Sequence, residues 1–346
     1  MAKRRTPVGI GLVGLGFMGL THLRASRGLK GGRVVAISTS DPRKAKGDFS
    51  RVKGNFGDAG AREDMTGIEV HSGLDELLAN PDVELVDLCL PSHLHAKAAT
   101  RCLNAGKSVL VEKPIAVNPK DAQAMLAAAK KSKTLLMVAQ VLKFFPEHRA
   151  LDQAIRREKY GKLLSLHLRR VIARPKWSDD DWLGNPKLSG GMAIDLHIHD
   201  TDYAISLFGR PRAVTSTGLM SSGQVDSIRT TYDFGKKGPL VTAEAGWING
   251  ASLPFEHGYE ACFEDASVYY NSTHCPTPKV FGKKSERPLP LGKAKDAFTL
   301  ELQAAVDSVR SGEVDPFVSA KSAALSLDVC LAEIQSLKKG TRIPLR

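Results

Sequence analysis

Short apolar runs alternate with helical patterns through the first 140 residues. The apolar runs are expected to form strands at residues 8–14, 33–39, 67–73, 83–90, 108–113 and 134–140. Residues 19–28 follow a helical pattern, and Asn118-Pro119 offers an N-cap with proline at the first helical position. Strands that alternate with helices predict a parallel sheet with helices on both faces.

The pattern changes after about residue 145. One helix is expected from Glu147 to Glu158, and two amphipathic helices close the chain at 297–310 and 319–338. Between them, apolar and polar residues alternate at 163–173, 213–222, 228–234, 240–248 and 259–270. Such alternation is typical of antiparallel strands with one solvated face. We therefore expect two domains, 1–140 and 141–346. The second is an α+β domain with a large, open, mostly antiparallel sheet, and the C-terminal helix can pack back on the first domain.

Composition narrows the class of protein. The 346 residues are 42% hydrophobic and 25% charged, which is ordinary for a globular protein, and no apolar run reaches the length of a membrane span. Five cysteines without C-x-x-C spacing favour a reducing, cytoplasmic compartment over a disulfide framework. The formal charge of +12 is dispersed and no nucleic-acid-reading motif accompanies it, so we expect an anionic small-molecule ligand, with neither nucleic acid nor membrane as a partner.

The run Gly14-Leu15-Gly16-Phe17-Met18-Gly19 matches G-x-G-x-x-G. It follows a predicted strand and opens a predicted helix, which is the context that a dinucleotide-binding loop requires. Gly14 permits the tight turn, Gly16 lets a pyrophosphate approach the backbone, and Gly19 lets the helix pack on the strand. Phe17 and Met18 lie within this loop and are expected to contact the cofactor, and the N-terminus of the helix that follows faces the phosphates. The first domain is therefore expected to be an α/β, doubly wound Rossmann sheet that binds a nicotinamide dinucleotide.

The second predicted strand ends in Ser38-Thr39-Ser40, and Arg43 follows closely. A site that prefers NAD usually has an acidic residue here, which binds the ribose 2′-hydroxyl. Small hydroxyls and a guanidinium suit a 2′-phosphate instead, so NADP is expected in preference to NAD. Asp41 keeps NAD possible, because its carboxylate could serve as a displaced ribose ligand.

The segment GGMAIDLHIHD, residues 190–200, gathers further polar residues. On a helix Asp195 and His199 share one face, while His197 lies about 200° away from Asp195. Contiguous helical positions do not converge on three ligands, so no metal site is expected. An imidazole, with an unperturbed pKa of about 6.5, suits removal of a hydroxyl proton. The alternative is a packed histidine and a capping aspartate.

Several motifs together resemble the Gfo/Idh/MocA oxidoreductase family, nearly end to end. They are the glycine loop, Pro91-Ser92-His93-Leu94-His95, Glu112-Lys113-Pro114, Phe144-Phe145-Pro146, the segment around residues 189–209 and the closing helical pattern. The resemblance implies that Lys113, Asp195 and His199 are catalytic. It also implies that Lys113 lies next to the nicotinamide, and we expect Pro91 and Glu112 to border the cofactor too. His95 follows the carboxyl end of the fourth predicted strand, where ligands bind in such sheets, so it is expected at one edge of the cofactor site; a histidine that only starts a helix is the alternative.

The sequence departs from the family at three positions that border the pocket. His197 stands where a glycine is common, Ser92 where an asparagine is common, and Lys143 where an arginine is common. These departures mean that the identity of a substrate does not transfer from the family. Trp177 and Trp182, with Asp179 to Asp181, precede the glycine pair, and their rings could stack on a sugar or pack ordinarily.

We assign His199 as the general base, Asp195 as its orienting or proton-relay partner, and Lys113 as the cation that stabilises a developing alkoxide. The expected activity is hydride transfer between a nicotinamide and a secondary hydroxyl of a sugar, cyclitol or sugar derivative. Two alternatives stay open: a glycosidase or lyase that oxidises a sugar transiently, and a non-catalytic nucleotide-bound homologue. The resemblance also implies a homodimer or homotetramer formed through the sheet of the second domain.

Overall fold

The computed structural model describes residues 6–54, 60–175, 181–248, 250–292 and 296–345. Trp177, Asp179 and Asp180 lie outside these residues. Contacts divide the chain into two units, residues 1–140 with 296–324, and residues 141–295 with 325–346. None of the described helices is long and apolar enough to cross a membrane.

The first unit is built on a six-stranded sheet in the order β3-β2-β1-β4-β5-β6, with every neighbouring pair parallel. This strand order is that of the Rossmann fold, so the predicted doubly wound sheet is confirmed. The strands are β1 Val8–Val13, β2 Gly32–Ser38, β3 Glu69–His71, β4 Leu85–Leu88, β5 Ser108–Glu112 and β6 Leu136–Ala139.

Helices accompany this sheet. They are α1 Phe17–Ser26, α2 Pro42–Ala45, α3 Leu74–Ala79, α4 His95–Asn104, α5 Pro119–Ser132 and α9 Ala297–Ser311. Asn118 caps α5 as predicted, because its side chain accepts from the backbone N–H of Asp121 at 3.0 Å. Although α9 is remote in sequence, it packs in this unit, where the Thr299 hydroxyl donates to the carbonyl of Ala25 in α1 at 3.1 Å.

The second unit contains a nine-stranded sheet in the order β14-β13-β12-β11-β7-β10-β9-β8-β15. Its strands are β7 Leu163–Val171, β8 Ala213–Ser221, β9 Gln224–Asp233, β10 Leu240–Gly246, β11 Glu256–Phe263, β12 Ala266–Asn271, β13 Cys275–Gly282, β14 Glu286–Pro288 and β15 Ile343–Pro344. All neighbours are antiparallel except β7 and β10, which are parallel. The mostly antiparallel sheet is confirmed.

The predicted strand at 259–270 is instead the hairpin of β11 and β12, which turns at Glu264 and Asp265. The sequence pattern did not indicate β13, because Pro276 and Pro278 lie inside it and proline is typical of strand breaks.

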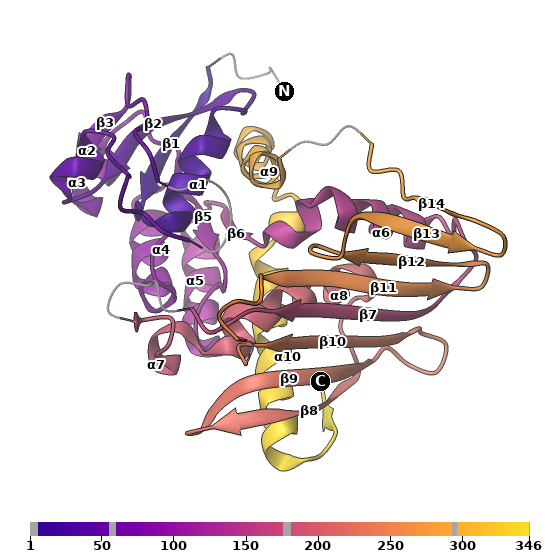
Figure 1. Ribbon diagram of the computed structural model, residues 1–346. Helices are drawn as coiled ribbons and strands as arrows, with labels where there is room; N and C mark the ends of the chain where they lie inside the picture. The colour runs from indigo at the N-terminus through magenta and orange to yellow at the C-terminus, as the bar shows by residue number, and fades with distance from the viewer. Residues whose placement is uncertain (1–5, 55–59, 176–180, 249, 293–295, 346) are drawn as a thin grey trace. The chain divides into compact units, whose positions relative to one another are not determined.

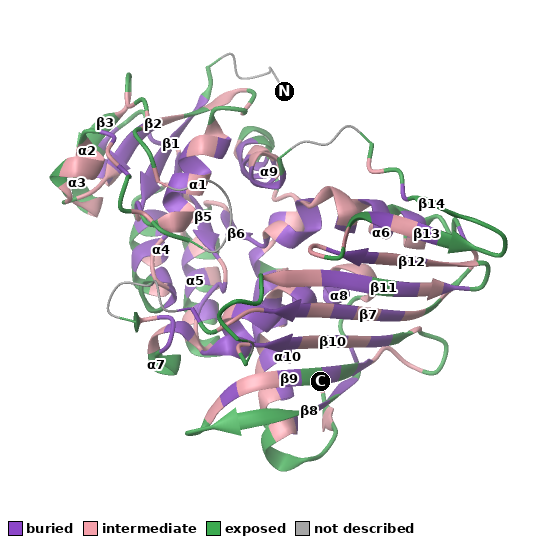
Figure 2. Ribbon diagram, in the orientation of Figure 1, coloured by how far each residue is buried: buried purple, intermediate pink, exposed green. Residues whose placement is uncertain are grey.

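Helices cover one face of this sheet (Figure 1). They are α6 Pro146–Arg156, α8 Ile198–Phe208 and α10 Ala320–Lys339, and the short α7 Pro186–Ser189 precedes the glycine pair. Leu151 of α6, Tyr203 of α8 and Val329 of α10 form one buried apolar core with side chains of the strands. Alternate strand residues on the opposite face are half-buried or exposed, as the pink and green bands on the sheet show in Figure 2.

Candidate functional site

The glycine loop after β1 has the geometry that a pyrophosphate needs. Gly14 has φ +88°, and a Cβ there would lie 2.4 Å from the carbonyl oxygen of Cys89. At Gly19 a Cβ would lie 2.0 Å from the carbonyl oxygen of Gly14, so only glycine lets α1 approach this closely. Gly16 has no neighbouring atom within 4 Å of its Cβ position, and it starts α1 without a capping side chain. The first N–H groups of α1 therefore face an open cradle suited to a dinucleotide phosphate.

The turn after β2 carries the residues expected to choose between cofactors. Asp41 caps α2, accepting from the backbone N–H of Arg43 at 2.9 Å and from its guanidinium at 3.0 Å. These hydrogen bonds lower the pKa of Asp41. The Thr39 hydroxyl in turn accepts from the backbone N–H of Asp41 at 3.1 Å. Ser38 and Thr39 are half-buried and Ser40 is exposed. The positive charge of Arg43 is therefore partly neutralised within its own turn.

Lys113 follows the end of β5, is half-buried, and precedes Pro114 across a cis peptide bond. Its neighbour Glu112 is buried and turned inward. One oxygen of Glu112 accepts from the backbone N–H of Lys113 at 3.0 Å, and the other lies 3.2 Å from Nε2 of His22. Glu112 therefore holds the backbone from which Lys113 projects.

His22, on α1, is the centre of a buried charge cluster that the sequence analysis did not identify. Its Nδ1 lies 2.9 Å from Asp87 of β4, and its Nε2 lies 3.2 Å from Glu112 and 3.9 Å from Glu301 of α9. Burial lowers the pKa of His22, but Asp87 and the neighbouring Cys89 together raise it by more. The pKa of His22 is therefore well above its usual value. The only signal in the sequence is that Asp87 and Glu112 interrupt apolar strands.

His22, Asp87 and Cys89 lie close enough together to hold a metal ion, as no other group of such residues does in the described parts of the chain. The two ring nitrogens of His22 are, however, at hydrogen-bonding distance from two different carboxylates. A protonated imidazole satisfies both contacts. Burial raises the pKa of the Cys89 thiol, which opposes the thiolate that a metal needs. The cluster therefore suits a proton better than a metal.

His95, expected at the cofactor, is fully buried at the start of α4. Its ring nitrogens lie 2.8 Å from the carbonyl oxygens of Pro114 and Leu90. Burial lowers its pKa below the usual value. The ring thus links the loops that follow β4 and β5. Pro91 stays half-buried in the same loop, and Ser92 is buried.

In the second unit a π-helical turn, Ala193–His197, leads directly into α8. Gly190 and Gly191 precede it with φ of +83° and +76°, a conformation that favours glycine. Asp195 and His199 are half-buried, whereas His197 is fully buried. The expected separation of His197 from the other two therefore matches the burial pattern, although the turn is wider than an α-helix. Isolated π-turns of this kind are frequent at functional sites.

Four buried polar residues around Asp195 and His199 are paired with neighbouring elements. Asp200 accepts from Arg170 of β7 at 2.8 Å and 3.2 Å. Asp202 lies 2.6 Å from Nζ of Lys143 and accepts from Ser326 at 2.8 Å. The remaining two, His197 and Thr201, contact Glu333 of α10.

Lys143 was expected to border the pocket. It is only 4% exposed and is ion-paired with Asp202, because a buried ammonium needs a carboxylate partner. Trp182, the described member of the tryptophan pair, is half-buried.

Comparison with known proteins shows the family to which the chain belongs. A model described as "Oxidoreductase family, NAD-binding Rossmann fold" matches residues 8–140, and a model of the GFO/IDH/MocA C-terminal domain matches residues 148–268. The chain belongs to the GFO/IDH/MocA family. Both candidate regions of this family member lie within the matched residues. The first model covers the glycine loop and Lys113, and the second covers Asp195 and His199.

Relatives of this GFO/IDH/MocA protein include dehydrogenases. Inositol 2-dehydrogenase of Rhizobium meliloti is 30% identical over 64% of this chain and 63% of its own length. Myo-inositol 2-dehydrogenase of Thermotoga maritima is 24% identical over 97% of this chain and 98% of its own length. An uncharacterised oxidoreductase of Schizosaccharomyces pombe is 32% identical, but the match spans only 42% of that relative.

Solved structures share the fold. Levoglucosan dehydrogenase in complex with NADH and levoglucosan aligns with a TM-score of 0.81 at 20% identity, covering 98% of this chain and 99% of that one.

Proposed function

We propose that the protein is an NAD(P)-dependent dehydrogenase or reductase that acts on a secondary hydroxyl of a sugar, cyclitol or sugar derivative. The observation that carries the proposal is the open cradle at Gly16, between two glycines that tolerate no side chain. The half-buried Lys113, Asp195 and His199 supply the polar groups that alcohol oxidation requires. Family membership and the names of the inositol and levoglucosan dehydrogenases support the substrate class.

Each residue would have a defined part in the reaction. A bound nicotinamide would accept or supply the hydride. Lys113 would hold the substrate oxygen and offset its negative charge as the O–H bond breaks. His199 would take the hydroxyl proton, while Asp195 would orient the imidazole or hold a neighbouring hydroxyl. Glu112 would fix the backbone of Lys113 through the hydrogen bond at 3.0 Å.

A panel of sugars, inositols and glycosides, assayed with NAD and NADP, tests this activity. We expect net cofactor reduction with at least one free polyol and the matching ketone as product. Cleavage of a glycoside without net cofactor change would assign transient oxidation instead. Cofactor binding with no turnover of any member of the panel would contradict the proposal.

We infer a preference for NADP, from the absence of an acidic residue at the end of β2 and the presence of Ser38, Thr39, Ser40 and Arg43. Asp41 weakens this preference, because it pairs with Arg43 at 3.0 Å. Asp41→Asn keeps a good helix cap but removes the charge, so NADPH should bind about 3- to 10-fold more tightly while NADH binding changes little. Fluorescence titration measures both affinities, and tighter NADH binding by the parent protein would refute the inference.

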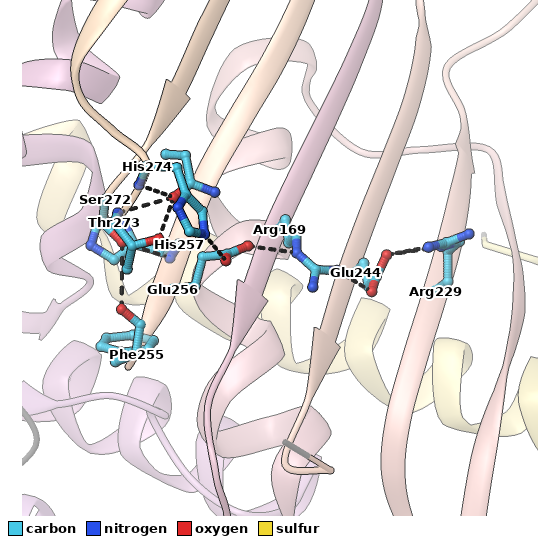
Figure 3. A network of polar contacts seen from close by, with 10 residues as sticks. Arg169, Arg229, Glu244, Phe255, Glu256, His257, Ser272, Thr273 and His274 are labelled. Carbon is cyan, nitrogen blue, oxygen red and sulfur yellow. Dashed lines mark hydrogen bonds and ion pairs between the residues drawn. The ribbon is translucent and has the colours of Figure 1, made fainter. Parts of the chain in front are cut away.

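We also infer that the sheet of the second unit forms a dimer or tetramer. Arg229, Glu244, Arg169 and Glu256 form an alternating row of charges across β9, β10, β7 and β11 (Figure 3). Arg169 donates to Glu256 at 2.8 Å, and both arginines contact Glu244. A row with opposite charges at its ends is complementary to itself when rotated by a two-fold axis. Light scattering should show an oligomer, and Arg229→Glu should weaken it more than Lys279→Glu, a change on the same sheet outside the row.

The five cysteines, all free thiols, support a cytoplasmic location. Fractionation of cells that produce the protein would test it.

A further inference from the structure

The contact between the π-helical turn and α10 involves none of the residues that react in the proposed mechanism. His197 lies in the last position of the turn, two residues from Asp195 and two from His199, and its Nε2 is 2.8 Å from Glu333 of α10. Both side chains are fully buried. Burying a carboxylate and an imidazole is costly unless each lies beside a partner, so the loss of either side chain leaves the other unfavourably placed.

The surrounding hydroxyls complete this contact. Thr201, one turn further along α8, donates to the other oxygen of Glu333 at 3.1 Å and lies 2.9 Å from the Tyr232 hydroxyl. Tyr232 in turn lies 3.4 Å from Nε2 of His197. Nδ1 of His197 has no hydrogen-bond partner among the described residues. Thr201 therefore holds one oxygen of Glu333, and Nε2 of His197 lies beside the other.

Two residues four apart, His197 and Thr201, are thus held by one carboxylate. Positions four apart lie on one side of a helix, and that side is buried against α10. A π-turn is an uncommon conformation that persists when its surroundings determine it. A fixed contact on the buried side sets the rotation of the helix about its axis, and therefore the direction in which the half-buried Asp195 and His199 point.

We propose that His197 and Glu333 form a positioning pair that fixes the rotation of the π-helical turn, and with it the side chains of Asp195 and His199. This proposal rests on the proposed function for its effect on turnover. The effect on the conformation of the segment does not depend on any substrate. His197 does not touch the reacting atoms in this scheme, so it is a positioning residue.

Comparing Glu333→Ala with Glu333→Gln separates the effect of losing the polar contact from the effect of losing the charge. Glutamine can still pair with Thr201 and, after a change of tautomer, with His197, whereas alanine cannot. We expect Glu333→Ala to lower kcat by about 10- to 100-fold with little change in KM or in the cofactor Kd, since small displacements of reacting groups have effects of this size. Glu333→Gln should stay within about 3-fold of the parent protein.

A control is needed for general destabilisation. Val280 is also buried, and it lies on β13, which β12, β11 and β7 separate from β10, a strand that contacts the π-helical turn. Val280→Ala should lower the thermal midpoint, as Glu333→Ala does, but leave kcat per folded protein unchanged. If Glu333→Ala does not fold, the double variant His197→Leu with Glu333→Met replaces both polar groups by apolar ones and keeps the fold measurable.

Hydrogen exchange of residues 193–199 gives the readout that does not depend on activity. We expect faster exchange in Glu333→Ala, or in the double variant, than in Val280→Ala. Parent-like exchange in 193–199 together with parent-like kcat would overturn the proposal. If the parent protein oxidises no polyol while the exchange result holds, the proposed function fails and the pair still holds the turn.

Discussion

The two units hold their candidate residues by different means. In the first unit the backbone forms the site, because Gly14, Gly16 and Gly19 shape a loop in which two positions have no room for a Cβ and the third faces open space. In the second unit buried side-chain pairs surround the candidate residues, among them Arg170 with Asp200 and Lys143 with Asp202. The glycine loop has no room for a side chain at Gly14 or Gly19, while a buried ion pair is destabilised when either partner is lost.

The largest expected effect tests whether the two units serve one reaction. Lys113→Ala and His199→Ala should each lower kcat by about 10²–10⁴-fold, through loss of charge stabilisation and of proton transfer. The double variant should lose less than the product of the two, because the proposed mechanism has both residues act on one transition state. His197→Gln should be milder, and a chelator should change nothing. Near-normal kcat in His199→Ala, or inactivation by chelator with recovery on zinc addition, would overturn the mechanism.

The next effect concerns the buried pairs of the second unit. Asp202→Ala leaves the Lys143 ammonium, only 4% exposed, without its carboxylate, so the free energy of unfolding should fall by about 3–5 kcal/mol. Replacing both partners, with Lys143→Met and Asp202→Leu, should cost far less. Urea unfolding measures the difference. Equal losses in the single and double variants would show that the pair does not hold this region.

The effect of an alanine substitution in the glycine loop should depend on which glycine is replaced. Gly19→Ala would place a Cβ 2.0 Å from the carbonyl oxygen of Gly14, so it should destabilise the first unit. Gly16→Ala meets no atom within 4 Å, so the fold should be retained while cofactor affinity falls by about 10-fold or more, because the methyl group occupies the phosphate approach. Circular dichroism and fluorescence titration separate the two. Unchanged cofactor affinity in Gly16→Ala would place the phosphates elsewhere.

The smallest effect is a pH dependence with opposite signs in the two units. Both His22 and His148 are fully buried, but carboxylates surround His22, whereas the rings of Tyr203, Tyr259 and Tyr270 surround His148. The pKa of His22 is raised well above its usual value, so its stabilisation is present below about pH 6.5 and is lost as pH rises toward the raised pKa. Burial lowers the pKa of His148 well below its usual value, so stability is lost as pH falls below about 6.5.

Hydrogen exchange across pH 5 to 9 can follow each unit separately. Each unit of difference between the pKa of a histidine in the folded and the unfolded protein changes the free energy of unfolding by about 1.4 kcal/mol. His22→Gln should flatten the alkaline dependence of the first unit, and His148→Phe the acid dependence of the second. The same pH slope in a variant and its parent would remove that histidine as the cause.

Local sequence signals predicted local features well. Asn118 and Pro119 marked the start of α5, and the glycine spacing marked the loop after β1. Features that depend on contacts between distant segments could not be predicted in this way. The cluster of His22, Asp87, Glu112 and Glu301 joins two helices and two strands. The π-helical turn also escaped prediction, because its residues have the same spacing as those of an α-helix over so short a segment.

The position of α9 has a consequence for the order in which the protein can be made. The first unit includes residues 296–324, and Glu301 and Thr299 contribute contacts to α1 from there. A ribosome therefore releases most of the dinucleotide-binding unit long before its last helix. At about 5–20 residues per second the interval between residue 140 and the end of α9 at Ser311 is roughly 9–34 s, during which the surface of α1 that α9 will cover is open to chaperones. Synthesis of the second unit fills that interval, so the nascent chain completes its first unit only after nearly all of its second has emerged.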